Sequence, residues 1–388
     1  MSRFYSYLNS ANHLIDLYKG ELPFAIFLKQ YFAKEKKYGS KDRKNISALC
    51  FNYFRIANAL KNCTKEERLV IGIYICEHKS NPILALLQPA WNETIHESVD
   101  FKINLLKDKI DVDTIFPLLQ YVANGIDKAL FATSICIQPN LFIRLRPEKE
   151  SLVIESLKAA DLAFESFSSS TLALVNGSKL PDSLVLDQDY VVQDASSQQV
   201  GTVLKTYLKT LTPSATVWDC CAASGGKSIM MKDAGFDSQL YVSDIRASIL
   251  ANLTQRFSAA GIKNYTQFIA DLTSPTIKAP LDYFDLILAD VPCSGSGTWG
   301  RTPEQLSFFK VEDIQLYTNR QNLIVANLSS FLKKNGLLVY ITCSVFKEEN
   351  EAIVKNIVQL GFDALHSQYI LGYKHKADSM FLSILQKK

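Results

Sequence analysis

The first third of the chain places its apolar residues at helical spacing. Between residues 24 and 32, and again between residues 46 and 54, the apolar positions follow the i, i+3, i+4, i+7, i+8 pattern of one buried helical face. A lysine-rich break at residues 34–44 separates the two stretches and is typical of an exposed loop. Further core helices are expected at 69–76, 83–87 and 115–122. The pattern therefore predicts an all-helical domain over residues 1–132.

The pattern changes near residue 139. Residues 140–146 and 171–175 have the pattern of strands and residues 153–163 that of a helix, which predicts a small α/β subdomain over residues 133–189. The first of these strands carries Arg144 and Arg146. These two side chains either face a phosphate backbone or form the solvated face of the strand, and the periodicity does not separate the two interpretations.

From Tyr190 onward, short apolar runs alternate with helical segments. Five strands are predicted, four that end in a carboxylate and a fifth that ends in a cysteine: residues 216–219, 240–244, 268–271, 285–290 and 337–343. Helices are expected at 228–233, 248–260 and about 315–333, a turn at Asn335-Gly336, and a last strand at 379–384. This alternation predicts an α/β fold over residues 190–388, with a mostly parallel sheet and helices on both faces.

Composition narrows the class of protein. The 388 residues carry 42 Lys and Arg against 39 Asp and Glu, a balance that neither demands nor excludes nucleic acid. Eight scattered cysteines without a CxxC pair, and five histidines outside zinc-ligand spacing, predict no structural metal and a reducing compartment. No apolar run approaches the length of a membrane span, about 20 residues, and residues 1–20 lack the pattern of a signal peptide. We expect a cytoplasmic protein and a monomer.

The turn after the first of these five strands is a predicted ligand site. Gly225 and Gly226 open a helix whose free N–H groups suit a carboxylate or phosphate, and Lys227 adds a positive charge. The turn fits neither the Walker A nor the GxGxxG pattern. Asp244, at the second strand end, suits a ribose diol, and Asp271, at the third, suits an adenine amino group. Each acid alone more often caps a helix, but together they favour S-adenosylmethionine, which has a ribose, a purine and an amino-acid carboxylate.

Two thiols and a carboxylate follow at the next strand ends. Adjacent parallel strands would bring Cys293 and Cys343 to one rim of the sheet, together with Asp290. Methylation of carbon 5 of a cytosine needs a nucleophile, because that carbon becomes reactive only after attack on carbon 6. Cys343, flanked by Thr342 and Ser344, is the predicted nucleophile. Asp290 is the predicted acid or hydrogen-bond partner of the ring nitrogen.

These segments resemble a known family of enzymes. Gln193-Asp-Ala-Ser-Ser-Gln198 resembles the segment that leads into its catalytic domain. Over roughly residues 138–388, three further motifs resemble those of the RsmB/NOL/NOP/Sun RNA cytosine-5 methyltransferases, in the same order: Asp219-Cys-Cys-Ala-Ala-Ser-Gly-Gly-Lys227, Asp290-Val-Pro-Cys-Ser-Gly-Ser-Gly297, and Tyr340-Ile-Thr-Cys-Ser344 with Glu348-Glu-Asn350.

The resemblance implies a Rossmann-like class I methyltransferase domain that uses S-adenosylmethionine and is preceded by an RRM-like subdomain. It implies that Cys343 is the covalent nucleophile, that Cys293 helps to release the methylated RNA, and that Asp290 touches both base and cofactor. Two positions depart from the family pattern, Ser224 in place of proline and Val291 in place of alanine, and neither removes a reactive group. The other residues that the resemblance assigns to the cofactor pocket are Cys221, Ala222, Ala223, Ser224, Gly225, Gly226, Lys227, Asp244 and Asp271.

The helical N-terminal part resembles the NusB-like domain of bacterial small-subunit rRNA enzymes of this family, through Asp42-Arg43 and residues 48–55. This resemblance favours 16S rRNA as the substrate, with tRNA as an alternative. Two other functions stay open: methylation of an exocyclic amine, and a catalytically silent rRNA-binding assembly factor. Amine methylation needs no cysteine, so the paired cysteines disfavour it. The complete set of reactive groups disfavours the silent factor.

Overall fold

The computed structural model describes every residue of the chain except 1–2, 210, 213 and 237–238. By its internal packing the chain forms two compact units. Unit 1 comprises Met1–Gln138 with Thr298–Val311, and unit 2 comprises Pro139–Gly297 with Glu312–Lys388. The predicted boundary between a small subdomain and a larger one near residue 189 stays a prediction, because both parts lie inside unit 2.

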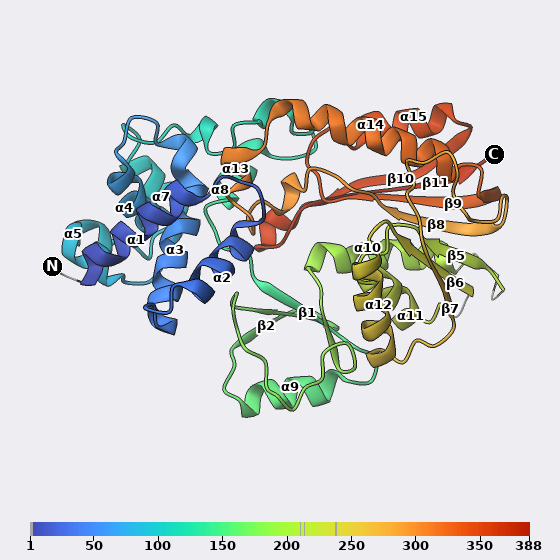
Figure 1. The fold of residues 1–388 in the computed structure, drawn as a ribbon, viewed down its shortest axis with the longest axis horizontal. Helices are drawn as coiled ribbons and strands as arrows, with labels where there is room; N and C mark the ends of the chain where they lie inside the picture. Colours follow the sequence, from blue (N-terminus) through green and yellow to red (C-terminus); the bar gives the residue numbers. More distant parts are fainter. Residues whose placement is uncertain (1–2, 210, 213, 237–238) are drawn as a thin grey trace. The chain divides into compact units, whose positions relative to one another are not determined.

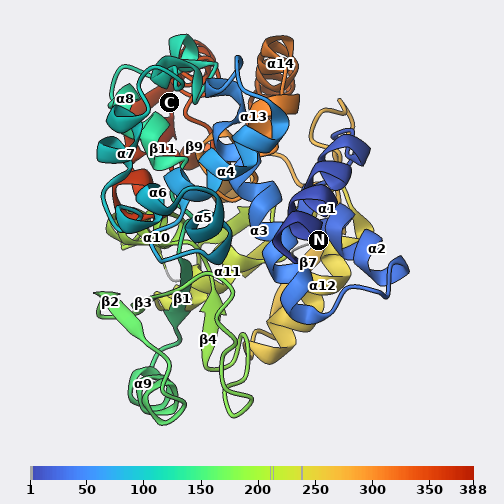
Figure 2. The same ribbon diagram turned by 90° about the vertical axis from the view of Figure 1, so that its left-hand side faces the viewer.

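Unit 1 is helical, as the apolar spacing predicted (Figures 1 and 2). The helices expected at 24–32, 46–54, 69–76 and 83–87 are confirmed. The α-helices of this unit are α1 (Arg3–Leu17), α2 (Phe24–Lys34), α3 (Ser40–Ile56), α4 (Lys65–Cys76), α5 (Pro82–Leu87), α6 (Pro89–Glu93), α7 (Val99–Leu105), α8 (Lys128–Ser134) and α13 (Gln305–Phe308), with a 3-10 turn η1 at Ala57–Ala59.

Two expectations for unit 1 are wrong. Residues 115–122 form no α-helix and contain only the 3-10 turn η3 (Leu119–Tyr121), shortly after the 3-10 turn η2 (Val112–Thr114). Pro117 explains the difference, because it has no N–H to donate and disfavours a helical residue before it. The expected loop at 34–44 is also too long, since α3 already begins at Ser40.

The segment Thr298–Val311 belongs to unit 1 although it is distant in sequence. Glu304 Oε1 accepts a hydrogen bond from Phe24 N at 3.0 Å, and Asn58 Nδ2 donates to Leu306 O at 2.9 Å. The buried Trp299 packs on Phe116, with ring centroids 5.3 Å apart. The chain therefore leaves unit 2 after Gly297 and returns to it at Glu312.

The small sheet of unit 2 is antiparallel. Its strand order is β2 (Phe164–Ser168), β3 (Thr171–Leu174), β1 (Leu141–Leu145), β4 (Tyr190–Val192), and α9 (Glu150–Ala159) packs Val153 and Leu157 into its core. The strands expected at 140–146 and 171–175 are confirmed, whereas β2 was not anticipated.

Both interpretations of Arg144 and Arg146 are wrong. Arg144 is only 6% exposed, and both guanidinium groups pair with Asp233 of α11 (Gly226–Asp233). They join the small sheet to α11, which packs on the large sheet, and both side chains are largely buried.

The large sheet has the order β10-β11-β9-β8-β5-β6-β7. Neighbouring strands from β9 to β7 pair in parallel, and β10 and β11 add an antiparallel edge, so the prediction of a mostly parallel sheet is confirmed. The strands are β5 (Thr216–Asp219), β6 (Gln239–Asp244), β7 (Tyr265–Ile269), β8 (Phe284–Asp290), β9 (Leu332–Thr342), β10 (Phe362–Ile370) and β11 (Met380–Lys387).

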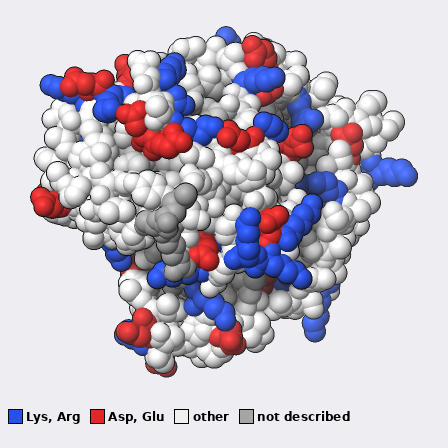
Figure 3. Space-filling view, turned by 60° about the vertical axis from the view of Figure 1, so that its left-hand side comes forward, with Lys and Arg blue, Asp and Glu red and all other residues white. Residues whose placement is uncertain are grey.

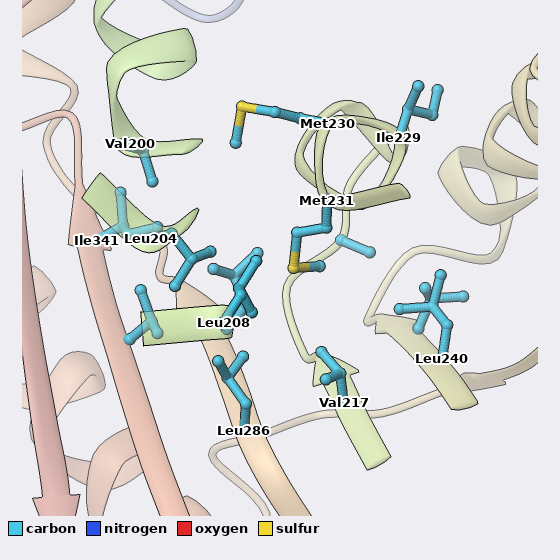
Figure 4. Packing of buried hydrophobic residues seen from close by; sticks show 14 of the residues in the cluster. Val200, Leu204, Leu208, Val217, Ile229, Met230, Met231, Leu240, Leu286 and Ile341 are labelled. Atoms are coloured by element: carbon cyan, nitrogen blue, oxygen red, sulfur yellow. The ribbon is translucent and has the colours of Figure 1, made fainter. Parts of the chain in front are cut away.

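Helices cover both faces of this sheet, as expected (Figure 1). α10 (Ala195–Leu208), α11 and α12 (Ala247–Ala259) pack on one face, and α14 (Val311–Leu328) and α15 (Glu351–Gln359) on the other. Successive residues of β8 alternate between the two cores: Leu286 and Leu288 face the first helix layer, and Ile287 faces the second. Figure 4 shows the first of these cores, in which side chains of α10 and α11 meet Val217 and Leu286.

Two details near the edge strands differ from the prediction. α14 ends at Leu328, before the predicted end near residue 333. The dipeptide Asn335-Gly336 forms no turn before a strand and lies inside β9, where the pairing with β8 shifts register. Asn335 adopts a left-handed φ of 62°, which asparagine tolerates, so the irregularity is absorbed within the strand.

Candidate active site and cofactor cleft

A cleft opens at the carboxyl ends of the parallel strands. It consists of two cavities, of about 520 and 270 Å³, that share Cys221, Ala223 and Asp290. The larger one reaches past the ends of β6 and β7, and the smaller one faces the start of α11. Nine of the ten predicted cofactor residues line one or both cavities: Cys221, Ala222, Ala223, Ser224, Gly226, Lys227, Asp244, Asp271 and Asp290.

Gly225 lines neither of these two cavities and instead forms the turn. Its φ of 84° is left-handed, and a Cβ there would lie 2.5 Å from Phe257 Cε1. Gly225 N donates to Ala222 O at 2.8 Å, which closes the turn just before α11 begins at Gly226. The turn thus brings the N-terminus of α11 to the smaller cavity.

The two strand-end acids face the larger cavity. Asp244 Oδ2 accepts from Ala223 N at 3.2 Å, and its Oδ1 accepts from Arg246 N at 3.0 Å, so it ties the end of β6 to the turn after β5. Asp271 lies two residues beyond β7, and its Oδ1 accepts from both N and Oγ1 of Thr273. The hydrogen bonds from Thr273 lower the pKa of Asp271.

Lys227 and Asp290 form a contact between the two motifs. Lys227 Nζ lies 2.5 Å from Asp290 Oδ2, and the lysine side chain is largely buried. Burial opposes the charged lysine, but attraction by Asp290 outweighs it with help from Asp219, and the net effect raises the pKa of Lys227. The lysine therefore stays protonated beside the carboxylate that was predicted to hold the base.

Asp219 also lines the smaller cavity, and the sequence reasoning did not select it as a candidate, although it ends the first motif strand. It is 1% exposed. Its Oδ2 accepts from Ser228 Oγ at 2.6 Å, and its buried Oδ1 has no hydrogen-bond partner among the described residues. Burial raises its pKa to about 7, against the opposing effect of the Ser228 hydrogen bond.

The two predicted thiols lie together beside the cleft. Cys293 Sγ and Cys343 Sγ are 3.3 Å apart, because β8 and β9 pair in parallel with Asp290 opposite Ile341. The hydrogen bond with Cys343, reinforced by burial, raises the pKa of the Cys293 thiol well above its usual value. Neither thiol lines the two cavities, whereas Pro292, next to Cys293, lines the larger one.

A buried carboxylate holds the two cysteine-bearing loops together. Glu349 is fully buried; its Oε2 accepts from Ser294 N and from Gln321 Nε2, both at 2.9 Å, and its Oε1 accepts from Ser344 Oγ at 2.6 Å. Ser294 follows one cysteine and Ser344 follows the other. The Glu348-Glu-Asn350 motif was recognised in the sequence, but this role of Glu349 was not.

Gly297 lets three backbone segments meet next to the thiols. Its N donates to Cys343 O at 2.9 Å, and its O accepts from Ser379 N at 2.9 Å. A Cβ at this position would lie 2.0 Å from Ser379 O. Only glycine fits this approach.

Two negative observations concern the part of the chain that the structure describes. There, no group of three or more His, Cys, Asp or Glu side chains is arranged to hold a metal ion. No helix in the described residues is long and apolar enough to cross a membrane.

On the face in Figure 3, basic and acidic side chains are interspersed, in keeping with the near balance of charge.

Comparisons with known proteins agree on the fold and the family. Residues 206–380 match the family model of the 16S rRNA methyltransferase RsmB/F. The chain is 31% identical over 228 residues to the probable ribosomal RNA small subunit methyltransferase B of Synechocystis, covering 57% of this chain and 50% of that protein. It is 32% identical over 177 residues to the ribosomal RNA small subunit methyltransferase B of Xanthomonas campestris, covering 45% and 39%. The chain thus spans about half, or less, of the length of these relatives.

Two solved structures share the fold. The crystal structure of PH0851 superposes with a TM-score of 0.71 at 18% identity, over 98% of both chains. That of NSun6 from Pyrococcus horikoshii with SFG gives a TM-score of 0.57 at 16% identity, over 70% of this chain and 97% of that one.

Proposed function

We propose, from the premise that residues 206–380 belong to the RsmB/F family of 16S rRNA methyltransferases, that the protein methylates carbon 5 of a cytosine in 16S rRNA. S-adenosylmethionine supplies the methyl group when bound. The observation that carries the proposal is the thiol pair, with 3.3 Å between Cys293 Sγ and Cys343 Sγ, at the rim of the cleft that Asp290 lines. A substrate of this kind places the protein in the cytoplasm.

The cleft suits this cofactor in its donors and acceptors. The N-terminus of α11 and Lys227 offer positive charge to a carboxylate in the smaller cavity, and Asp219 and Asp290 offer acceptors to an ammonium group. Asp244 and Asp271 line the larger cavity, where a ribose and a purine would lie. SFG, present in the NSun6 structure of the same fold, is an analogue of S-adenosylmethionine.

The reaction assigned to these residues starts with a bond from Cys343 Sγ to carbon 6 of the cytosine. As this bond forms, the thiol proton of Cys343 is passed through Asp290 to N3, and the electrons of the C5–C6 double bond form an enamine with its nucleophilic end at carbon 5. Carbon 5 then takes the methyl group, and N3 gives the proton back. Release requires loss of the carbon-5 proton and cleavage of the sulfur–carbon bond. We assign Cys293 to that step, because its sulfur lies next to that of Cys343.

The test traps the covalent step. The Cys293→Ala protein is incubated with small-subunit rRNA and S-adenosylmethionine and run on a denaturing gel. A slowly migrating protein–RNA adduct is expected, and it should be absent from the Cys293→Ala/Cys343→Ala double variant. The Cys63→Ala variant is a matched control, because Cys63 is a free, partly buried cysteine of unit 1.

Each outcome separates two functions. An adduct identifies cytosine-5 chemistry, and sequencing of the trapped RNA names the nucleotide. An adduct formed with tRNA, and not with rRNA, changes the substrate only. Cofactor binding without an adduct on either RNA favours methylation of an exocyclic amine. A wild-type protein that binds RNA but no cofactor contradicts the proposal and favours the assembly factor.

A further inference from the structure

We propose that Arg256 is a positioning residue for the cofactor, which holds the turn at Ser224 in the conformation that binds it. The proposal rests on the proposed function, because it concerns the same cleft. It explains how this chain compensates for the serine that stands where the family pattern has proline.

The turn needs external support. Ser224 lies between Ala223 and Gly225, whose φ angles of 46° and 84° are both left-handed. A left-handed alanine is strained, and a serine between the two fixes no backbone angle, whereas the proline ring would fix φ. The conformation of the turn sets the direction of the N–H groups at the start of α11 and of Lys227.

Arg256 supplies that support from α12. Its Nη1 donates to Ser224 Oγ at 2.8 Å and to Ser224 O at 3.1 Å. The hydroxyl that distinguishes serine from proline is thus used as an acceptor. Arg256 also lines the smaller cavity, so that the contact lies at the wall of the cleft.

The guanidinium group is itself fixed from the other side. Its Nε and Nη2 donate to the two carboxylate oxygens of Asp187, at 2.9 and 2.7 Å, a bidentate geometry that only arginine offers. Asp187 is 3% exposed, and its N donates to Tyr190 O at 2.7 Å. Arg146 of the small sheet donates to Asp187 O. The chain of contacts runs from β1 through Asp187 and Arg256 to Ser224.

This arrangement predicts a specific pattern of affinities. Loss of Arg256 frees the turn and weakens cofactor binding without touching the groups that hold RNA. Proline at 224 restores rigidity by a different route and makes Arg256 largely dispensable. A residue that merely stabilised the fold would not be rescued in this way.

The test compares Arg256→Ala, Arg256→Lys, Ser224→Pro and the Ser224→Pro/Arg256→Ala double variant. The dissociation constant for S-adenosylmethionine is measured by calorimetry, the KM for RNA by methyl transfer, and Tm by thermal unfolding. Arg68→Ala is the matched control, because Arg68 is a partly buried helical arginine of unit 1 that donates to the carbonyl of Cys63.

Arg256→Ala is expected to raise the dissociation constant about tenfold or more, the effect of losing hydrogen bonds from a charged group, with an unchanged KM for RNA. Arg256→Lys should fall in between, and the double variant should recover most of the affinity. A wild-type affinity in Arg256→Ala overturns the proposal. So does a weakened binding that proline fails to rescue and that is matched by an equal change in the KM for RNA.

Two further arms keep the result interpretable. If Arg256→Ala does not fold, Ser224→Gly carries the test, since it removes the Oγ acceptor and adds backbone freedom; an unchanged affinity in this variant overturns the proposal. A wild-type protein without affinity for S-adenosylmethionine contradicts the proposed function itself. If the wild type binds S-adenosylmethionine and Arg256→Ala binds it with the same affinity, only the role of Arg256 is contradicted.

Discussion

Lys227 and Asp290 form an ion pair with 2.5 Å between Nζ and Oδ2, which joins the turn after β5 to the end of β8. One residue comes from the motif predicted to bind the cofactor and the other from the motif predicted to bind the base. The pair therefore connects the two halves of the proposed reaction.

Replacing Lys227 tests this connection. Lys227→Met leaves Asp290 without its cation and should lower adduct formation and cofactor affinity together, each by roughly 10- to 100-fold, because hydrogen bonds to charged groups contribute about 1.5–3 kcal/mol. Lys227→Arg keeps the charge in a different shape and should lose less. The measurement is the rate of adduct formation with calorimetry of the cofactor. Lys205→Met, on the exposed side of α10, is the control and should behave as the wild type.

Asp219 predicts a pH dependence of stability. Its pKa is raised by burial from 3.8 to about 7, so the folded protein binds a proton that the unfolded chain releases between these values. The neutral carboxyl group of Asp219 therefore adds to the free energy of unfolding in full below about pH 4, and this stabilisation is lost as the pH rises through 7.

Asp219→Asn keeps an acceptor for Ser228 and cannot ionise. Its Tm relative to the wild type should increase steadily from pH 4 to pH 7. Thermal unfolding at intervals of half a pH unit measures this difference. A difference that stays constant over the range would show that Asp219 is not protonated in the folded protein.

Replacement of Glu349 by alanine should lower both the stability of the protein and its activity. Glu349→Ala removes an acceptor from the half-buried Ser294 N–H and from the buried Ser344 hydroxyl, at a cost of about 1–3 kcal/mol for each hydrogen bond lost. Adduct formation by the Cys293→Ala protein should fall further than Tm alone explains, because the loop that carries Cys343 loses its anchor. Glu349→Gln should be milder, and Glu312→Gln, at the exposed start of α14, should have no effect. Equal activity of Glu349→Ala and the wild type at a temperature where both are folded contradicts this role.

Replacing Gly297 or Gly177 by alanine should lower the free energy of unfolding by different amounts. At Gly297 a Cβ meets Ser379 O at 2.0 Å, so the backbone must move, and a destabilisation of about 2–4 kcal/mol or more is expected together with loss of activity. At Gly177, which has a φ of 81° and nothing within 4 Å, only backbone strain of about 1–2 kcal/mol is expected. Denaturant unfolding of both variants gives the comparison. A smaller loss at Gly297 than at Gly177 would contradict the steric account.

The sequence could predict where the candidate site residues lie in the fold, because short parallel strands constrain their positions strongly. An apolar run that ends in an acid marks the carboxyl edge of a sheet, which is why Asp244 and Asp290 lie where they were expected. The adjacency of Cys293 and Cys343 follows from the same geometry.

What the sequence could not predict depends on partners that are distant along the chain. Arg144 and Arg146 alternate like exposed strand residues, and their burial depends on distant partners, above all on Asp233 almost ninety residues later. Glu349 accepts a hydrogen bond from Ser294, which lies 55 positions earlier in the chain, and another from the nearby Ser344. Asn335-Gly336 has turn chemistry, but the pairing of β9 with two neighbours keeps it within a strand. The local sequence pattern predicts whether a segment is a helix or a strand. In these cases, however, contacts with residues distant in sequence determine which side chains are buried and where a strand continues.

The excursion of Thr298–Val311 into unit 1 means that the protein cannot be divided by one cut. A fragment that starts at Pro139 would retain Trp299 and Glu304 but lose Phe116 and Phe24, against which they are buried. With its indole exposed and its carboxylate unpaired, such a fragment would be prone to aggregate. The exposed segment would begin directly after Gly297, whose N–H donates to the carbonyl of Cys343. Gene fusions or domain exchanges among relatives would therefore have to carry both crossings of the chain together.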